Sequence, residues 1–314
     1  MSAPILNERS DLPGPLRRRG PRPLLLHLTL AMLRSSASIA TSGIWNPDSP
    51  PWKDGSTPHG AAWAALWASA AGAAPAAAGA DPGFTGAVMA EAMRQDAALV
   101  AGIAAYRRHP YARDLQDPPA LWREGDSRLL DYATGGTGPA VLFVPSLVNR
   151  AYVLDLAPGR SMLRWLAGQG FRPMLLDWGW PGPAERGFTL TDYIAGRLER
   201  ALAAAVEGPV VLAGYCMGGL LALAAALRRP DMVRGLALLA TPWDFHAAGD
   251  GAGERIAGLV SLLEPALALH AALPIDALQM LFALLDPFGV AEKYRAFARL
   301  DQAGARAELF VALE

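Results

Sequence analysis

Short apolar runs recur through the part of the chain that follows Pro118. A continuous apolar run of this kind is typical of a strand that is buried on both faces of a parallel sheet. The strand candidates are Leu129–Tyr132, Ala140–Val144, Pro173–Leu176, Val210–Leu212 and Leu236–Leu239.

Helical patterns occupy several of the segments between these runs. The helix candidates are Leu163–Ala167, Thr191 to about Val206, and Leu220–Leu227. Strands that alternate with helices at these intervals predict a doubly wound, mainly parallel sheet of the α/β class. From Phe245 onward the pattern becomes helical and apolar, and no further strand is expected.

The first 117 residues lack this alternation. Residues 1–23 are rich in Pro and Arg, which is typical of a disordered segment. Gly60–Ala80 is Ala-rich and chargeless, but Pro75 divides it, so a surface-packed helix is favoured over a membrane span. Ala87–Tyr106 has a further helical pattern. We therefore expect this region to be partly disordered and partly helical.

A basic cluster precedes an apolar segment near the N-terminus and allows two interpretations. Arg17–Arg19 followed by Leu24–Leu33 resembles the basic region and apolar core of a signal peptide. However, His27 interrupts the apolar core and Arg34 closes it. An amphipathic helix is the alternative, and it is the favoured interpretation.

The composition excludes several classes of function. With 28 basic residues, 29 acidic residues and a net charge of -1, the chain has no electrostatic basis for binding nucleic acid or an anionic membrane. The single cysteine excludes an internal disulfide framework and a Cys-based metal site, and no metal-ligand cluster is expected. A lone thiol is compatible with a reducing compartment, which favours the cytoplasm.

The pentad Gly214-Tyr215-Cys216-Met217-Gly218 lies between a predicted strand and a predicted helix. This arrangement is typical of a nucleophile elbow, a strained turn that projects one side chain from the carboxyl edge of a sheet. Gly214 and Gly218 are expected because a Cβ atom there would collide with neighbouring backbone. Cys216 is thus a candidate nucleophile, whose thiolate the adjacent helix N-terminus favours. A buried structural cysteine is the alternative.

Three motifs in order resemble the polyhydroxyalkanoate synthase family. Gly214–Gly219 looks like the lipase-like box of these enzymes, with Cys216 at the nucleophile position. Pro145–Leu156 is similar to the family's loop after an early core strand, and Asp177–Pro181 to the segment after its next strand. The resemblance covers roughly residues 118–314.

The resemblance implies an α/β-hydrolase fold with a cysteine nucleophile and a helical cap. Residues 1–117 would then form an N-terminal region, residues 118–244 the core, and residues 245–314 the start of the cap. The family's Asp and His motifs have no counterpart before Glu314. The expectation is therefore a core that is incomplete at its C-terminal side.

The resemblance also implies an acyltransferase that polymerises hydroxyacyl-coenzyme A into polyhydroxyalkanoate. Cys216 would carry the acyl group as a thioester, so coenzyme A enters as part of the substrate and no cofactor is expected. The backbone N–H groups of Met217 and Val148 would form the oxyanion hole. The implied partners are the growing polyester chain, a second synthase subunit or a second copy of the chain, and the surface of cytoplasmic polymer granules.

The chain lacks a clear general base, which leaves alternatives open. His246 follows the last predicted strand and His270 lies in an apolar helical stretch, and neither matches the expected order of the catalytic residues. The sequence is either an incomplete version of a longer enzyme, which is favoured, or a non-catalytic granule-associated homologue. A thioesterase or esterase, in which water accepts the acyl group, is a further alternative.

Overall fold

The computed structural model describes residues 18–42, 82–133, 136–205, 208–247 and 273–314, together with positions 251, 257, 258 and 264. Contacts divide the chain into two compact units, of which one combines Met1–Tyr111 with Pro274–Ala312 and the other spans Ala112–Leu273. The predictions for Gly60–Ala80 and for most of residues 1–23 lie outside the described residues.

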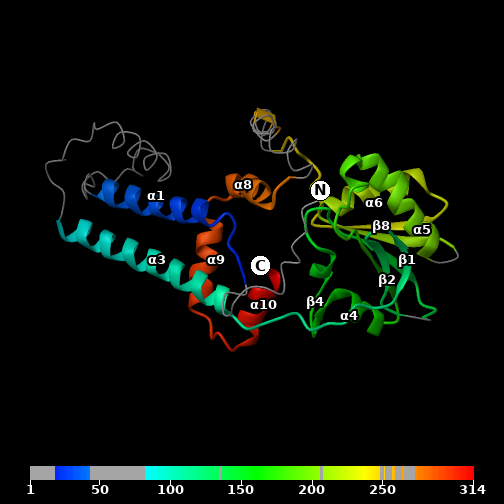
Figure 1. Cartoon of the computed structure of the whole chain (residues 1–314), viewed down its shortest axis with the longest axis horizontal. Helices are drawn as coiled ribbons and strands as arrows, with labels where there is room; N and C mark the ends of the chain where they lie inside the picture. Colours follow the sequence, from blue (N-terminus) through cyan, green and yellow to red (C-terminus); the bar gives the residue numbers. More distant parts are fainter. Residues whose placement is uncertain are drawn as a thin grey trace, which may run out of the picture. The chain divides into compact units, whose positions relative to one another are not determined.

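Six strands form one sheet in the Ala112–Leu273 unit (Figure 1). They are β1 (Ala120–Glu124), β2 (Ser127–Asp131), β3 (Ala140–Val144), β6 (Arg172–Asp177), β7 (Val210–Tyr215) and β8 (Val233–Leu239). Their order is β1-β2-β6-β3-β7-β8. The last four in this order run parallel, whereas β1 and β2 pair antiparallel at one edge. The predicted mainly parallel sheet is therefore confirmed.

Three short strands were not predicted. β1 alternates half-buried and exposed residues at the sheet edge, and its charged C-terminal end breaks the continuous apolar run expected of a buried strand. The other two, β4 (Asp155–Ala157) and β5 (Arg160–Ser161), form a small separate hairpin.

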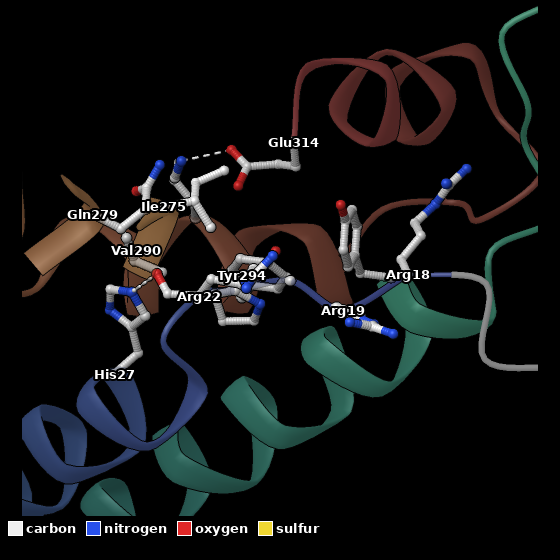
Figure 2. Close-up of a pocket in the computed structure, with 13 residues that line it drawn as sticks. Arg18, Arg19, Arg22, His27, Ile275, Gln279, Val290, Tyr294 and Glu314 are labelled. Atoms are coloured by element: carbon white, nitrogen blue, oxygen red, sulfur yellow. Dashed lines mark hydrogen bonds and ion pairs between the residues drawn. The ribbon is translucent and has the colours of Figure 1, made fainter. Parts of the chain in front are cut away.

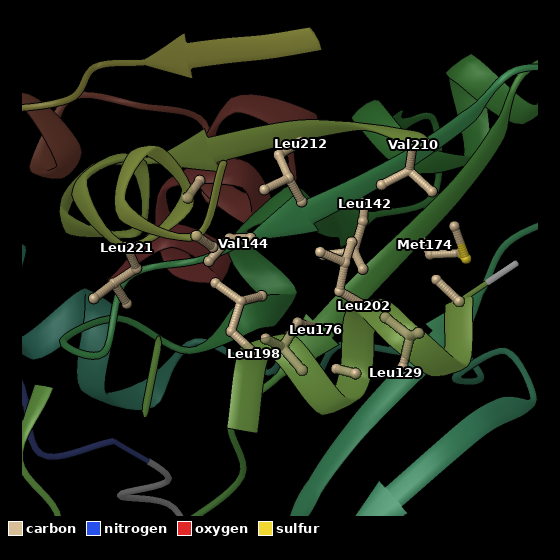
Figure 3. Close-up of a cluster of buried hydrophobic side chains, with 14 residues drawn as sticks. Leu129, Leu142, Val144, Met174, Leu176, Leu198, Leu202, Val210, Leu212 and Leu221 are labelled. Carbon is tan, nitrogen blue, oxygen red and sulfur yellow. The ribbon is translucent and has the colours of Figure 1, made fainter. Parts of the chain in front are cut away.

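Helices cover both faces of the sheet. Successive residues of a strand point to opposite faces, so neighbours such as Leu142 and Phe143 pack in different clusters. Leu142 and Leu212 face α5 (Glu199–Ala205) and α6 (Met217–Arg228) in one buried cluster, shown in Figure 3. Phe143 packs on the other face, in a cluster with residues from the 3₁₀ turn η2 (Ala151–Leu154) and from α4 (Met162–Gly168).

The helix predicted from Thr191 is divided. Its first part is a π-helical segment, η4 (Asp192–Leu198), and its second part is α5. A π-helical segment closes its hydrogen bonds between residues i and i+5, where an α-helix uses i and i+4. Arg197, in η4, is buried and donates hydrogen bonds to the carbonyl of Glu124 and the hydroxyl of Ser127, both at 2.9 Å.

The other unit is helical. It contains α1 (Leu24–Ser42), α3 (Pro82–Arg108), α8 (Ile275–Leu285), α9 (Gly289–Ala298) and α10 (Ala305–Leu313). Leu99 and Ile103 of α3 share a buried cluster with Tyr294 and Phe297 of α9. The helices approach closely at Gly102, where a Cβ atom would lie 1.9 Å from the carbonyl oxygen of Tyr294.

The C-terminal helices thus group with the N-terminal ones. The sequence analysis instead placed residues 245–314 in one piece that follows the sheet, because side-chain patterns do not reveal which distant helices pack together. The assignment of these residues to a cap stays a prediction.

Helix α1 is long and apolar enough, by length and composition, to cross a membrane, and it is the one such helix among the described residues. In the structure, its residue Ala31 belongs to the buried cluster that also contains Leu99. A signal sequence and a helix of a folded domain both pass such a test, so the two interpretations of Leu24–Leu33 remain.

Candidate active site

A sharp turn between β7 and α6 carries Cys216. Its backbone angles are φ 53° and ψ −130°, an unusual conformation for a residue with a side chain. The Cys216 N–H donates a hydrogen bond to the carbonyl of Leu239 on β8, and its carbonyl accepts one from Gly219 N–H, both at 2.9 Å. The turn is therefore fixed from both sides, and the half-buried Cys216 has the backbone geometry of a strained elbow.

Glycines beside Cys216 allow the backbone segments around it to touch. A Cβ atom on Gly214 would lie 2.3 Å from the Cα of Gly219, and one on Gly218 would lie 2.1 Å from the carbonyl oxygen of Val144. The sequence analysis did not single out Gly219 for this reason. A Cβ atom there would lie 1.8 Å from Oγ1 of Thr241, which follows β8.

Replacing Gly218 with alanine is expected to destabilise the sheet unit by about 3 kcal/mol, because the added methyl group meets two backbone carbonyls that cannot turn away. Gly168, at the end of α4, has open space around its Cβ position, so Gly168→Ala serves as the matched control. Urea denaturation followed by circular dichroism would measure both changes. Equal stability of the two variants would contradict the steric argument.

The predicted oxyanion-hole donors lie at the ends of two neighbouring strands. Met217 is the first residue of α6, where amide groups lack an intrahelical acceptor. Val148 follows β3, which pairs with β7 so that Val144 lies opposite Gly214. However, the Val148 N–H donates to the hydroxyl of Ser146 at 3.0 Å. In this conformation it offers no free donor, and the oxyanion role of both groups stays a prediction.

The loops after β3 and β6 are tied to each other. The Trp178 indole N–H donates to the carbonyl of Pro145 at 3.0 Å, and Arg150 donates to the carbonyl of Gly179 at 3.0 Å. The Arg150 guanidinium also lies over the Trp180 ring, 4.5 Å from its centroid. These contacts join the segments Pro145–Leu156 and Asp177–Pro181, which the sequence analysis singled out separately.

Sequence reasoning missed the role of Asp155, a fully buried carboxylate at the start of β4. Arg164 donates to both of its oxygens, at 2.8 and 3.0 Å, and Arg113 and the Tyr132 hydroxyl each donate at 3.0 Å. Burial and the neighbouring carboxylate raise the pKa of Tyr132, so its hydroxyl remains a donor. Only the contacts of the folded chain reveal this network, since its members are widely separated in sequence.

A cavity of about 110 Å³ lies in the same unit, and three arginines line it. Arg128 pairs with Asp177 at 2.6 Å and with Asp117 at 3.0 Å. Arg113 pairs with Asp155, and Arg150 makes the contacts described above. The charges of this cavity are thus largely balanced by its own walls.

Within the sheet unit, no hydrogen bond joins the Cys216 thiol to a described histidine. His246 lies in the segment after β8, where its N–H donates to Asp244 at 2.9 Å. His109 is buried in the helical unit and contacts the carbonyl of Gln302 at 2.8 Å. His270 and His59 lie outside the described residues. The described residues also contain no cluster of three potential metal ligands.

Comparison with known proteins shows which proteins the chain resembles. Residues 139–274 match the family model of the alpha/beta hydrolase fold. The chain is 34% identical over 176 residues to the poly(3-hydroxyalkanoate) polymerase subunit PhaC of Haloferax mediterranei, a match that covers 53% of this chain and 35% of that protein. It is also 34% identical over 161 residues to the PhaC subunit of Allochromatium vinosum, covering 49% and 44% of the two chains. Over about half of its length, the chain is thus similar to poly(3-hydroxyalkanoate) polymerase subunits.

The match to the polymerases covers less than half of each of these two relatives. Among solved structures, a thioesterase domain from the curacin biosynthetic pathway is similar with a TM-score of 0.37 and 20% identity, covering 48% of this chain and 53% of that one. Potato epoxide hydrolase I gives a TM-score of 0.33 and 20% identity, covering 46% and 45%.

Proposed function

We propose that this chain carries the nucleophile of a polyhydroxyalkanoate polymerase and transfers hydroxyacyl groups from coenzyme A to a growing polyester. The observation that carries the proposal is the strained turn at Cys216, in a chain that is similar to the polymerases. A structural cysteine in a core does not need a positive φ angle. Such strain is concentrated at functional sites.

The proposed reaction has two steps. The Cys216 thiolate attacks the thioester carbonyl of the substrate, the bond between the carbonyl carbon and the sulfur of coenzyme A breaks, and coenzyme A leaves as its thiolate. The hydroxyl at the end of the polymer then attacks the acyl-Cys216 thioester. An ester bond forms as the thioester bond to Cys216 breaks. The polymer is then longer by one monomer, and the Cys216 thiolate is free again.

Both steps require control of protons and charge. The carbonyl oxygen of the attacked thioester becomes negative as the tetrahedral intermediate forms. The backbone N–H of Met217, the residue after the nucleophile, is proposed to stabilise this charge. Participation of Val148 requires its N–H to leave, or to share, the hydroxyl of Ser146. A base must also accept the protons of the thiol and of the attacking hydroxyl.

The proposed environment follows from the reaction. The substrate is a hydroxyacyl-coenzyme A thioester and the product is an insoluble polyester, so we place the enzyme in the cytoplasm and at the surface of polymer granules. A second copy of the chain or a second synthase subunit is the proposed protein partner. A nucleic acid is not among the proposed binding partners.

Product analysis tests the proposal against its closest alternative. The chain is incubated with 3-hydroxybutyryl-coenzyme A, and the released thiol, the free hydroxy acid and the polymer are measured separately. Polymer, or a stable acyl-protein adduct without free acid, is expected. Stoichiometric release of free hydroxy acid would instead show a thioesterase.

A second candidate, which the sequence analysis left open, is a non-catalytic granule-associated protein. Labelling with iodoacetamide separates the two, because an activated thiolate reacts faster than an ordinary thiol. Under the polymerase proposal, Cys216 of the folded chain is alkylated faster than the same residue in the urea-unfolded chain. Slower alkylation in the folded chain, with granule binding retained, would support the second candidate.

A further inference from the structure

A cavity of about 300 Å³ lies within the helical unit, beside the segment that precedes α1 (Figure 2). Arg18, Arg19 and Arg22 line it from that segment, and Lys293 lines it from α9. Glu314 is the single acidic residue among the described lining residues. The described lining therefore carries a net positive charge, in contrast to the balanced cavity of the sheet unit.

Buried polar atoms in this cavity lack a hydrogen-bond partner among the described residues. They are the Tyr294 hydroxyl, the Nε of Arg18 and the Nδ1 of His27. Tyr294 is 0% exposed and His27 is 2% exposed. Buried polar groups in native proteins are almost always paired. Three unpaired atoms around one cavity therefore point to a polar ligand.

The state of His27 follows from its contacts. Its Nε2 lies 3.1 Å from the carbonyl of Arg22, which only accepts hydrogen bonds, so Nε2 carries the proton. Burial lowers the pKa of His27 and the charge of Lys293 lowers it further, while the Arg22 carbonyl and Glu314 act in the opposite direction. The neutral ring then presents Nδ1 as an acceptor, which suits a hydroxyl group of a ligand.

Two cations of the cavity, Arg22 and Lys293, are held by exposed ion pairs, whereas Arg18 donates a hydrogen bond to the carbonyl of Tyr111. Arg22 pairs with Asp276 at 2.9 Å, and the two side chains are 44% and 46% exposed. Lys293 pairs with Glu314 at 2.5 Å, and its side chain is 49% exposed. Exposed ion pairs contribute little to stability. Both cations can therefore exchange these partners for a ligand at small cost.

We propose that this cavity binds the phosphate group of a small anionic ligand. Arginine side chains offer paired donors that match phosphate oxygens, and the Tyr294 hydroxyl adds a further donor. The volume of about 300 Å³ exceeds that of a phosphate group and falls at the lower end of small-molecule sites. Ile275 and Val290 supply apolar walls for an organic portion. The described lining residues belong to the helical unit, and none of them has a role in the chemistry proposed for Cys216.

Calorimetric titration of the 314-residue chain tests the proposal with inorganic phosphate, ADP and coenzyme A at constant ionic strength. At least one probe is expected to bind saturably, and Arg18→Gln and Arg22→Gln should each weaken its binding about tenfold, through loss of a charge-assisted hydrogen bond. Arg34→Gln is the matched control. Arg34 of α1 pairs with Glu292 of α9, but it does not line the cavity.

Tyr294→Phe provides a second readout that a purely structural tyrosine would not give. The variant is expected to raise the melting temperature of the free chain, because it removes a buried unpaired hydroxyl, and to weaken binding of the same probe. No saturable binding of any probe would overturn the proposal. Binding that all of the cavity variants leave unchanged would also overturn it, because the probe would then occupy another site. Cys216→Ala should not affect this binding, so the proposal and the polymerase function can fail independently.

Discussion

Replacing Cys216 with alanine is expected to abolish acyl loading of this chain. Loss of a catalytic nucleophile typically reduces turnover by a factor on the order of 10⁶. Since the chain contains one cysteine, the alanine variant has no thiol left to form a thioester. Intact-mass spectrometry after incubation with 3-hydroxybutyryl-coenzyme A would show the hydroxyacyl adduct on the native chain and its absence from the variant.

Cys216→Ser is the matched control for this measurement. Serine preserves the shape of the side chain but attacks a thioester poorly without a strong base. We expect much slower loading in this variant and unchanged thermal stability in both. An adduct that persists in Cys216→Ala, or release of coenzyme A at the native rate, would refute the role of Cys216.

Replacing Asp155 with alanine is expected to destabilise the sheet unit by about 3 kcal/mol. The change leaves the guanidinium groups of Arg113 and Arg164 without their buried anion. Removing one partner of a buried ion pair typically costs about 3–5 kcal/mol, and the partial exposure of Arg164 places the effect at the lower end. Urea denaturation monitored by circular dichroism would measure the loss.

Asp231→Ala is the control for this prediction, because Asp231 also pairs with an arginine, Arg229, but its side chain is 65% exposed. An exposed pair of this kind contributes less than about 1 kcal/mol. A loss at Asp155 no larger than the loss at Asp231 would show that the buried network does not stabilise the fold.

The same network predicts the response to acid. Burial favours the neutral form of Asp155, but hydrogen bonds from Arg164 and Ser161 more than offset it and hold the pKa of this carboxyl below its usual value. Its contribution to stability is therefore fully present above the pKa of the unfolded chain, and it is lost as the pH falls through the lower pKa of the folded chain. Asp155→Asn should make the free energy of unfolding less dependent on pH in the acidic range.

Local patterns were sufficient to predict most of the sheet. Runs such as Ala140–Val144 are continuous and apolar because both faces of the strand are covered, so the sequence itself marks them. The elbow was predictable for a similar reason. Its glycines and its cysteine are adjacent in sequence, and the steric demand of the turn falls on those same residues.

The edge of the sheet was harder to predict. β1 is half exposed and carries charged residues, so its pattern differs little from that of a loop. The π-helical segment at Asp192–Leu198 was also missed, because the sequence there has an ordinary helical pattern. Such details depend on what each segment packs against, and a periodic pattern does not contain that information.

The sequence by itself determined the parallel sheet, the strained turn at Cys216 and the three motifs that indicate the polymerase family. Only the tertiary structure decided that Arg150 ties two motif loops together and that the C-terminal helices pack with the N-terminal ones. The physical reason is the range of the interactions. Backbone conformation and burial leave a periodic record in neighbouring residues, whereas contacts between segments far apart in the chain arise only when the fold brings them together.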